Sequence, residues 1–72
     1  MEYVVDLIHR GPGGVIKAVT SSEVDVGTPA VAFTAGHRVF ATRDADCGAN
    51  GFRVTERRTG KVVVTWMSDG TY

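Results

Sequence analysis

The sequence predicts an α+β domain in which a single helix packs on one face of a four-stranded antiparallel sheet. Four segments alternate between apolar and polar residues with the two-residue period of a β-strand. They form two pairs, and a short turn that contains glycine separates the members of each pair, as in antiparallel hairpins. One stretch with helical spacing lies between the pairs. We therefore expect the order strand, strand, helix, strand, strand in one domain over residues 1–72.

The first predicted hairpin joins strands over Tyr3 to Arg10 and Val15 to Val26 through the turn Gly11-Pro12-Gly13-Gly14. Both faces of the first strand carry apolar residues, which indicates that neither face is wholly solvated. The second strand is long. If its register breaks, we expect the bulge or bend at Thr20-Ser21-Ser22, where a polar run interrupts the alternation.

The predicted helix runs from Pro29 to about Arg43. Thr28 is a favourable N-cap residue, and proline is tolerated at the first helical position. One apolar stripe, with three- and four-residue spacing, contains Ala32, Phe33, Gly36, Val39 and Phe40. Gly36 costs about 1 kcal/mol of helix stability relative to alanine. Its place within the stripe predicts that the helix axis comes closest to the sheet there.

The second predicted hairpin follows a loop over Asp44 to Gly51, whose composition is typical of turns. Its strands cover Phe52 to Arg58 and Lys61 to Met67, and the turn between them is Thr59-Gly60. The chain closes with a short polar tail, Ser68 to Tyr72, which we expect to fray.

The strand alternation assigns each sheet residue either to the face that the helix covers or to the opposite, open face. The helix-covered face is predicted to carry Tyr3, Val5, Leu7, Ile16, Ala18, Val54, Val62, Val64 and Trp66. The open face is predicted to carry Val4, Ile8, Val19, Val63 and Met67 among Asp6, Arg10, Lys17, Arg53, Thr55, Arg57, Lys61 and Thr65. A solvated face normally shows cleaner polarity, so this mixture predicts contact with another molecule or with a second copy of the chain.

Length and composition narrow the class of protein. A chain of 72 residues buries only roughly 60% of its unfolded surface, so its stability is expected to be marginal unless it oligomerises. Eight basic residues balance eight acidic ones, and this zero net charge argues against a dedicated DNA-binding protein. The single cysteine, Cys47, cannot form an internal disulfide, which favours the reducing cytoplasm of a host cell. We recognise no signal peptide and no membrane-spanning stretch.

Three residues are candidate nucleophiles or metal ligands, namely His9, His37 and Cys47. They are predicted to lie in a strand, in the helix and in a loop, and no spacing links them. A catalytic Cys–His pair also needs an orienting group and an oxyanion site, and structural zinc usually needs several cysteines. We therefore expect a protein without enzymatic activity.

The segment Asp44-x-Asp46-x-Gly48-x-Asn50-Gly51 is similar to the opening of a calcium-binding loop. A glycine replaces the acidic ligand at the fifth position of an EF-hand, and Thr55 replaces the glutamate at the twelfth. An ordinary turn is the favoured interpretation. The run Gly11-x-Gly13-Gly14 precedes a strand rather than a helix, so it is not a phosphate-binding loop. We expect no metal and no cofactor.

Four cations lie close together on the second hairpin, and in the sequence only Glu56 opposes them: Arg53, Arg57, Arg58 and Lys61. One interpretation is a basic patch that meets phosphates or an acidic protein. The other is a charged hairpin that is kept soluble and protected from edge pairing. With two further cations, the candidate partner-binding residues are Arg53, Arg57, Arg58, Lys61, Lys17 and Arg10. Tyr3, Phe52 and Trp66 all fall on the helix-covered face, which argues against base stacking on the open face.

Several segments together define the layout of the chain. They are Tyr3-Val4-Val5-Asp6-Leu7, Val24-Asp25-Val26, a short alanine-containing helix, the Cys47-Gly48 loop, Phe52-Arg53-Val54-Thr55-Glu56, Val62-Val63-Val64-Thr65-Trp66 and Asp69-Gly70. In order, length and style, this layout resembles a group of very small phage proteins that includes anti-CRISPR inhibitors of type I CRISPR systems. The resemblance covers most of the chain. The zero net charge departs from the strongly acidic inhibitors that mimic DNA.

The resemblance implies a protein without catalytic residues that binds a CRISPR effector complex through surface side chains and blocks target DNA binding or nuclease recruitment. It also implies that Arg53, Arg57 and Lys61 contact the effector. We therefore expect a non-enzymatic protein-binding inhibitor from a phage or another mobile element. Two alternatives stay open: a small protein that binds nucleic acid weakly through residues 53–61, and a phage structural protein that forms a homodimer through the open face or an edge strand.

Overall fold

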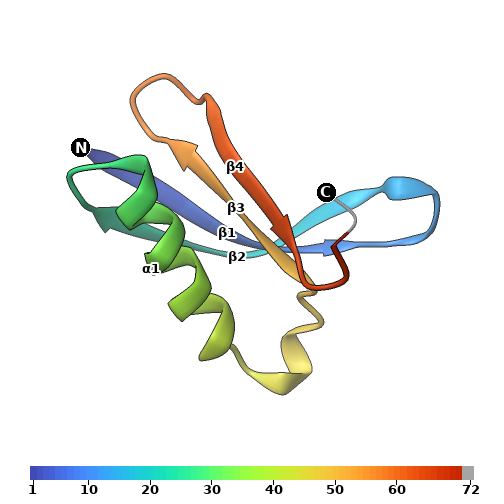
Figure 1. Cartoon of the computed structure of the whole chain (residues 1–72). Helices are drawn as coiled ribbons and strands as arrows, with labels where there is room; N and C mark the ends of the chain where they lie inside the picture. Colours follow the sequence, from blue (N-terminus) through green and yellow to red (C-terminus); the bar gives the residue numbers. More distant parts are fainter. Residues whose placement is uncertain (71–72) are drawn as a thin grey trace.

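A computed structural model describes residues 1–70 of the chain, except for the side chain of residue 45. The elements are β1 (Glu2–Arg10), a 3-10 turn (Pro12–Gly14), β2 (Ile16–Asp25), α1 (Pro29–Ala41), a second 3-10 turn (Ala45–Cys47), β3 (Gly51–Glu56) and β4 (Val62–Met67). Figure 1 shows the strands in one sheet with α1 against one of its faces. The predicted α+β fold and the order strand, strand, helix, strand, strand are confirmed.

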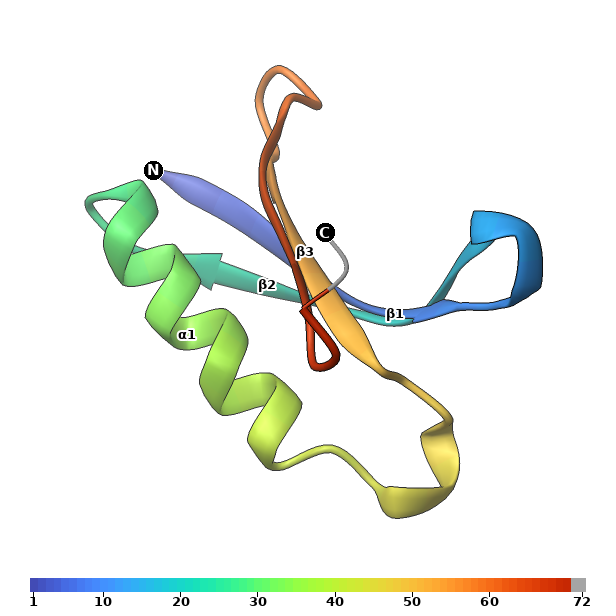
Figure 2. The same cartoon turned by 45° about the vertical axis from the view of Figure 1, so that its right-hand side comes forward.

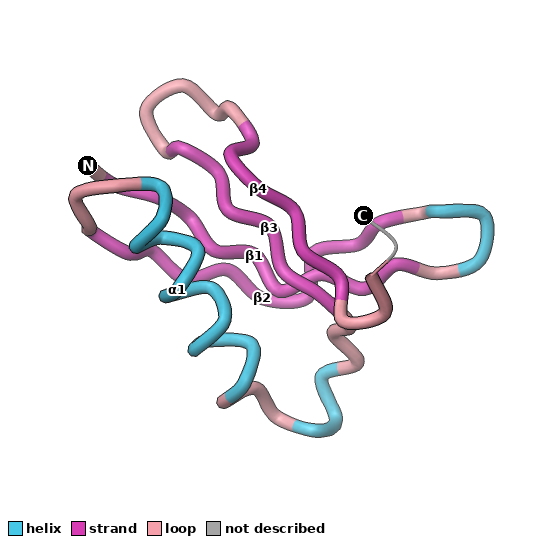
Figure 3. The backbone as a smooth tube through the Cα atoms, in the orientation of Figure 1, coloured by secondary structure: helices cyan, strands magenta, loops and turns pink. Residues whose placement is uncertain are grey.

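The order of the strands across the sheet is β2-β1-β3-β4, and every neighbouring pair is antiparallel. The N-terminal strand therefore lies in the interior of the sheet and joins the two hairpins, while β2 and β4 form the edges. Figure 3 shows the strands side by side with α1 on one side of them. This order places residues of β1 and β2 beside residues of β3 that are far away in the sequence.

The predicted start of the helix is confirmed, and its end comes two residues earlier than expected. Thr28 is the N-cap residue, because its Oγ1 accepts a hydrogen bond from the Val31 N–H at 3.3 Å. At the other end the Thr42 N–H donates to the Arg38 carbonyl at 3.1 Å, while the Arg43 N–H donates to the Phe40 carbonyl at 3.3 Å. These contacts close the last turn, so the helix ends at Ala41.

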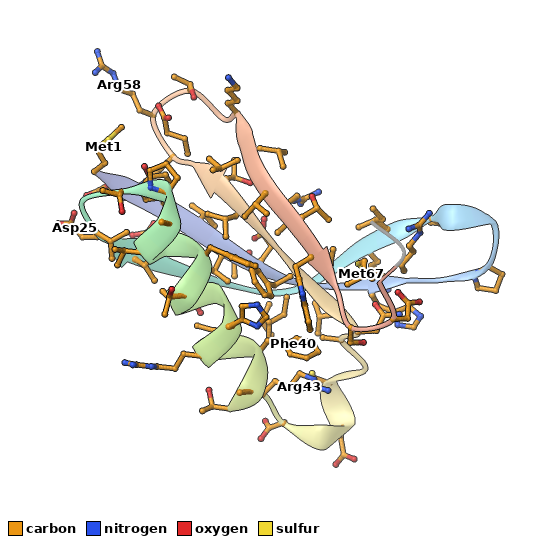
Figure 4. All side chains as sticks on the ribbon, in the orientation of Figure 1. Met1, Asp25, Phe40, Arg43, Arg58 and Met67 are labelled. Atoms are coloured by element: carbon orange, nitrogen blue, oxygen red, sulfur yellow. The ribbon has the colours of Figure 1, made fainter. Side chains whose placement is uncertain are left out.

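The apolar stripe of α1 packs on β1 and β3, as predicted. Figure 2 shows α1 lying along one side of the sheet. Its closest approach is at Gly36, where a Cβ atom would lie 2.4 Å from Cε2 of Phe52. The core consists of Tyr3, Val5, Leu7, Ala32, Phe40, Ala49, Phe52 and Val54. Figure 4 shows Arg43 beside Phe40 at the end of the helix, where the guanidinium carbon lies 3.7 Å from the centre of the Phe40 ring.

A bulge in the first hairpin reverses part of the predicted face assignment. The register between β1 and β2 shifts between Leu7 and Ile8, so Val19 has no partner on β1. As a result Ile16 and Ala18 lie opposite Arg10 and Ile8 on the open face, and Lys17 lies opposite His9 on the helix-covered side. Val19 packs against the core instead of lying on the open face. The bulge also falls just before the predicted position at residues 20–22.

A second bulge has the same effect in the second hairpin. The register between β3 and β4 shifts between Val54 and Thr55, so Val62 lies opposite Thr55 on the open face. Val62 is 49% exposed rather than covered by the helix. Val63, predicted on the open face, packs against the core. One extra residue in a strand is enough to exchange the faces of the residues that follow it.

The described part of the tail is held to the sheet. The Ser68 N–H and hydroxyl both donate to the Asn50 carbonyl at 2.9 Å, and the Gly70 N–H donates to the Met67 carbonyl at 3.1 Å. The rest of the predicted tail, Thr71 and Tyr72, lies outside the described residues. Across residues 1–70, none of the helical segments combines the length and the apolar character that a membrane crossing requires.

Candidate interaction surface

Arg53 lies on the open face in contact with a buried carboxylate. Its Nη2 donates to Oδ2 of Asp6 at 3.3 Å, and the Ser21 hydroxyl donates to the other carboxylate oxygen of Asp6. The three residues come from β3, β1 and β2, and they lie in one row across the sheet. Nε of Arg53 is buried without a hydrogen-bond partner among the described residues. The positive charge of Arg53 is therefore paired with the Asp6 carboxylate of the same sheet.

Arg57 is also neutralised within the chain. Its Nη1 lies 2.8 Å from Oε2 of Glu2 and 3.2 Å from Oε2 of Glu23. The expectation that only Glu56 opposes the basic residues is therefore wrong, because the strand order brings acids of β1 and β2 beside the end of β3. The Glu56 carboxylate itself accepts a hydrogen bond from the Thr59 hydroxyl at 3.3 Å.

Arg58 and Lys61 remain exposed at the turn between β3 and β4, and neither forms an ion pair with another described residue. Figure 4 shows the Arg58 side chain extending away from the sheet. Val62 follows Lys61 directly, and the bulge turns it to the open face. We call Arg58, Lys61 and Val62 the hairpin surface. The sequence alone did not place Val62 on the hairpin surface, because no sequence pattern indicated the bulge.

A shallow groove of about 410 Å³ adjoins the hairpin surface on the open face. It is lined by Val4, Asp6, Arg53, Thr55, Glu56, Arg57, Gly60 and Val62. Val4 and Val62 form its apolar part, and the Arg53–Asp6 ion pair forms its polar part together with Thr55, Glu56 and Arg57. The groove and the hairpin surface together offer apolar contact next to Arg58 and Lys61, which have no ion-pair partner within residues 1–70.

Lys17 and Arg10 lie at the other end of the sheet. They belong to the hairpin of β1 and β2, which extends away from the helix (Figure 2). The backbone of Arg10 is held by the Asn50 side chain, whose Oδ1 accepts from the Arg10 N–H at 2.9 Å and whose Nδ2 donates to its carbonyl at 3.2 Å. The six candidate partner-binding residues therefore occupy two separate regions.

The histidines and the cysteine have contacts with their own fold. The His37 ring packs against Phe33 and Trp66, with ring centroids 4.7 and 4.6 Å away. Nδ1 of His9 lies 2.8 Å from the Gly48 carbonyl oxygen. His9 and Cys47 line the same cleft of about 470 Å³, a proximity that the sequence spacing did not predict.

Cys47 and Asn50 belong to the loop that was compared with a calcium site. Sγ of Cys47 accepts a hydrogen bond from the Ala49 N–H at 3.5 Å. Both ends of the Asn50 amide form hydrogen bonds with the backbone of Arg10 in β1. Among the residues that the structure describes, no group of three or more His, Cys, Asp or Glu side chains could hold a metal ion.

Comparisons with known proteins returned no match for this chain. No protein-family model matches the chain, and neither the curated protein sequences nor the solved structures contain a significant match. The function therefore has to be argued from the surface itself.

Proposed function

We propose that this protein is a non-enzymatic inhibitor that docks through its hairpin surface on a larger protein complex, with a CRISPR effector complex as the partner. The observation that carries the proposal is the exposure of Arg58 and Lys61 next to Val62, which lines the edge of the groove. Protein interfaces combine an apolar centre with a polar rim, and arginine is over-represented among the residues that contribute most to binding.

The internal ion pairs favour a protein partner over nucleic acid. Binding to a phosphate backbone depends on cations whose charge is not already balanced. Arg53 and Arg57 are balanced by Asp6, Glu2 and Glu23, so the open face presents carboxylates together with its cations. A protein surface can match such a mixed pattern, whereas a uniformly negative backbone cannot.

The choice of a CRISPR effector is supported by the resemblance of the chain layout to small phage inhibitors. The inhibitor would act by occupying a site on the effector in the host cytoplasm, without a cofactor and without chemistry. The contacts of His9, His37 and Cys47 agree with this proposal, because each of these side chains contributes to packing or hydrogen bonding within the fold.

The test is a binding measurement with purified type I effector complexes and a charge-reversal variant, Arg58→Glu with Lys61→Glu. Reversal of these two residues leaves the internal ion pairs of Arg53 and Arg57 intact, so the fold should be unaffected. We expect the variant to bind at least about tenfold more weakly, which corresponds to about 1.4 kcal/mol.

The matched control is Arg38→Glu, which reverses an exposed charge on α1 and should leave binding unchanged. Equal binding by the parent and the double variant would show that the hairpin surface is not the contact. Failure of the parent protein to bind any of the effector complexes would rule out a CRISPR effector as its partner. Salt-sensitive binding to nucleic acid instead would assign the same cations to phosphate contacts.

A further inference from the structure

The β4 strand is an edge without the usual protection against pairing. It is the outermost strand of the sheet on its side, and its sequence, VVVTWM, contains no charged residue and no proline. Natural edge strands commonly carry charges, prolines or bulges that discourage another strand from pairing. The opposite edge, β2, has these features, with Lys17, Glu23 and Asp25 in the strand and a bulge at Val19. The second hairpin has a bulge too, but it lies at the beginning of β4 and leaves Val64 to Met67 regular.

The backbone groups that β4 offers can be read from its pairing with β3. The Ser68 N–H donates to the Asn50 carbonyl, and hydrogen-bonded pairs recur at every second position of an antiparallel ladder. Trp66 and Val64 therefore direct their backbone groups towards β3. Thr65 lies between them, opposite Arg53, so its N–H and C=O point away from the sheet. An added strand can form hydrogen bonds with Thr65 without disturbing the existing ladder.

The regular part of β4 can pair with an identical strand in an antiparallel register centred on Thr65. This part runs from Val64 to Met67, between the bulge at Val63 and the turn that the Gly70 N–H closes on the Met67 carbonyl. With a two-fold axis at Thr65, the outward N–H of this residue in each copy meets the outward C=O of Thr65 in the other copy.

The side chains on the helix-covered face match in the same antiparallel register. Val64 of one copy lies opposite Trp66 of the other, and pairs of aromatic and β-branched residues stabilise adjacent strands. Trp66 is only partly buried, and it already stacks on Phe52 with ring centroids 5.4 Å apart. A second copy would cover its outer edge and extend the aromatic cluster.

We propose that two copies of this chain pair through their β4 edges, antiparallel about a two-fold axis at Thr65, and form one continuous sheet from the two four-stranded sheets. The dimer removes the unprotected edge of each copy. It also adds buried surface to a domain whose size limits its own core. The contact rests mainly on one strand from each copy, so we expect dissociation in the micromolar range rather than a permanent dimer.

The test is sedimentation equilibrium over a range of protein concentrations, with Thr65→Pro as the blocking variant. Proline at this position removes an N–H that points away from the sheet, and edge strands tolerate proline at such positions. The matched control is Glu23→Pro, because the hydrogen bond from Val26 to Met1 places residue 23 in the equivalent outward position on the β2 edge.

We expect the parent and Glu23→Pro to dimerise as the concentration rises, and Thr65→Pro to stay a folded monomer. A parent protein that stays monomeric at every concentration would overturn the proposal. A strand of another protein would then be the candidate partner of the β4 edge. A dimer that survives Thr65→Pro, or one that Glu23→Pro abolishes, would also overturn it.

Discussion

Replacement of Gly36 by alanine tests how closely the helix approaches the sheet. The added Cβ would lie 2.4, 2.7 and 3.0 Å from Cε2, Cδ2 and Cζ of Phe52. That ring is fully buried and contacts the rings of Trp66 and Phe33 at 5.4 and 5.6 Å, so it has no room to move aside. Overpacking of a core costs about 1–3 kcal/mol, whereas alanine gains about 1 kcal/mol of helix propensity over glycine.

We therefore expect Gly36→Ala to lower the free energy of unfolding by up to about 2 kcal/mol, which is the difference between these two terms at the upper end of the overpacking cost. The melting temperature should fall by roughly 4–8 °C for each kcal/mol lost. Urea unfolding followed by far-UV circular dichroism measures the change. In a Phe52→Leu background, which removes the ring, the same substitution should become neutral or stabilising. An increase in the stability of the parent by Gly36→Ala would refute the close packing of α1 on β3.

Three further substitutions test other contacts of the fold by the same unfolding measurement. Asp6→Ala should cost about 2–4 kcal/mol, because it leaves the partly buried Arg53 without its carboxylate partner. Asp25→Ala, which removes an exposed carboxylate, should cost less than about 1 kcal/mol. Similar losses in the two variants would contradict a structural role for the Asp6–Arg53 pair. Asn50→Ala should cost about 1–3 kcal/mol because it removes both side-chain hydrogen bonds to the end of β1. Asn50→Asp should also be destabilising, because a carboxylate oxygen would face the Arg10 carbonyl oxygen in place of the Nδ2 donor; full stability in either variant would argue against these contacts. Thr28→Ala should cost about 1 kcal/mol by removing the helix cap, and Thr28→Ser should retain most of that stability; equal losses would argue against the cap.

Local sequence patterns were sufficient to predict the elements and the helix contact. The cap at Thr28 and the close approach at Gly36 depend on residues a few positions apart, so their signals are continuous in the sequence. The turns of both hairpins depend on short glycine-containing segments in the same way. The fold class followed from these elements because one helix and one sheet have few ways to bury their apolar faces.

Features that depend on strand pairing could not be predicted in this way. Val19 and Val63 occupy bulges, and a single extra residue in a strand has no local signature that identifies it. The partners of Arg57, Glu2 and Glu23, become neighbours only because β1 lies between β2 and β3. The sequence therefore suggested more unpaired positive charge on the second hairpin than the structure shows. The candidate surface is accordingly limited to the turn of that hairpin.

The most direct test of the proposed inhibitory function is phage plaquing on bacteria whose type I CRISPR system targets that phage. Expression of the parent protein should raise the plaquing efficiency towards that on bacteria without CRISPR immunity. The variant with Arg58→Glu and Lys61→Glu, expressed to the same level, should leave immunity largely intact. Plaquing that stays at the immune level with the parent protein, across a panel of type I systems, would contradict the proposal.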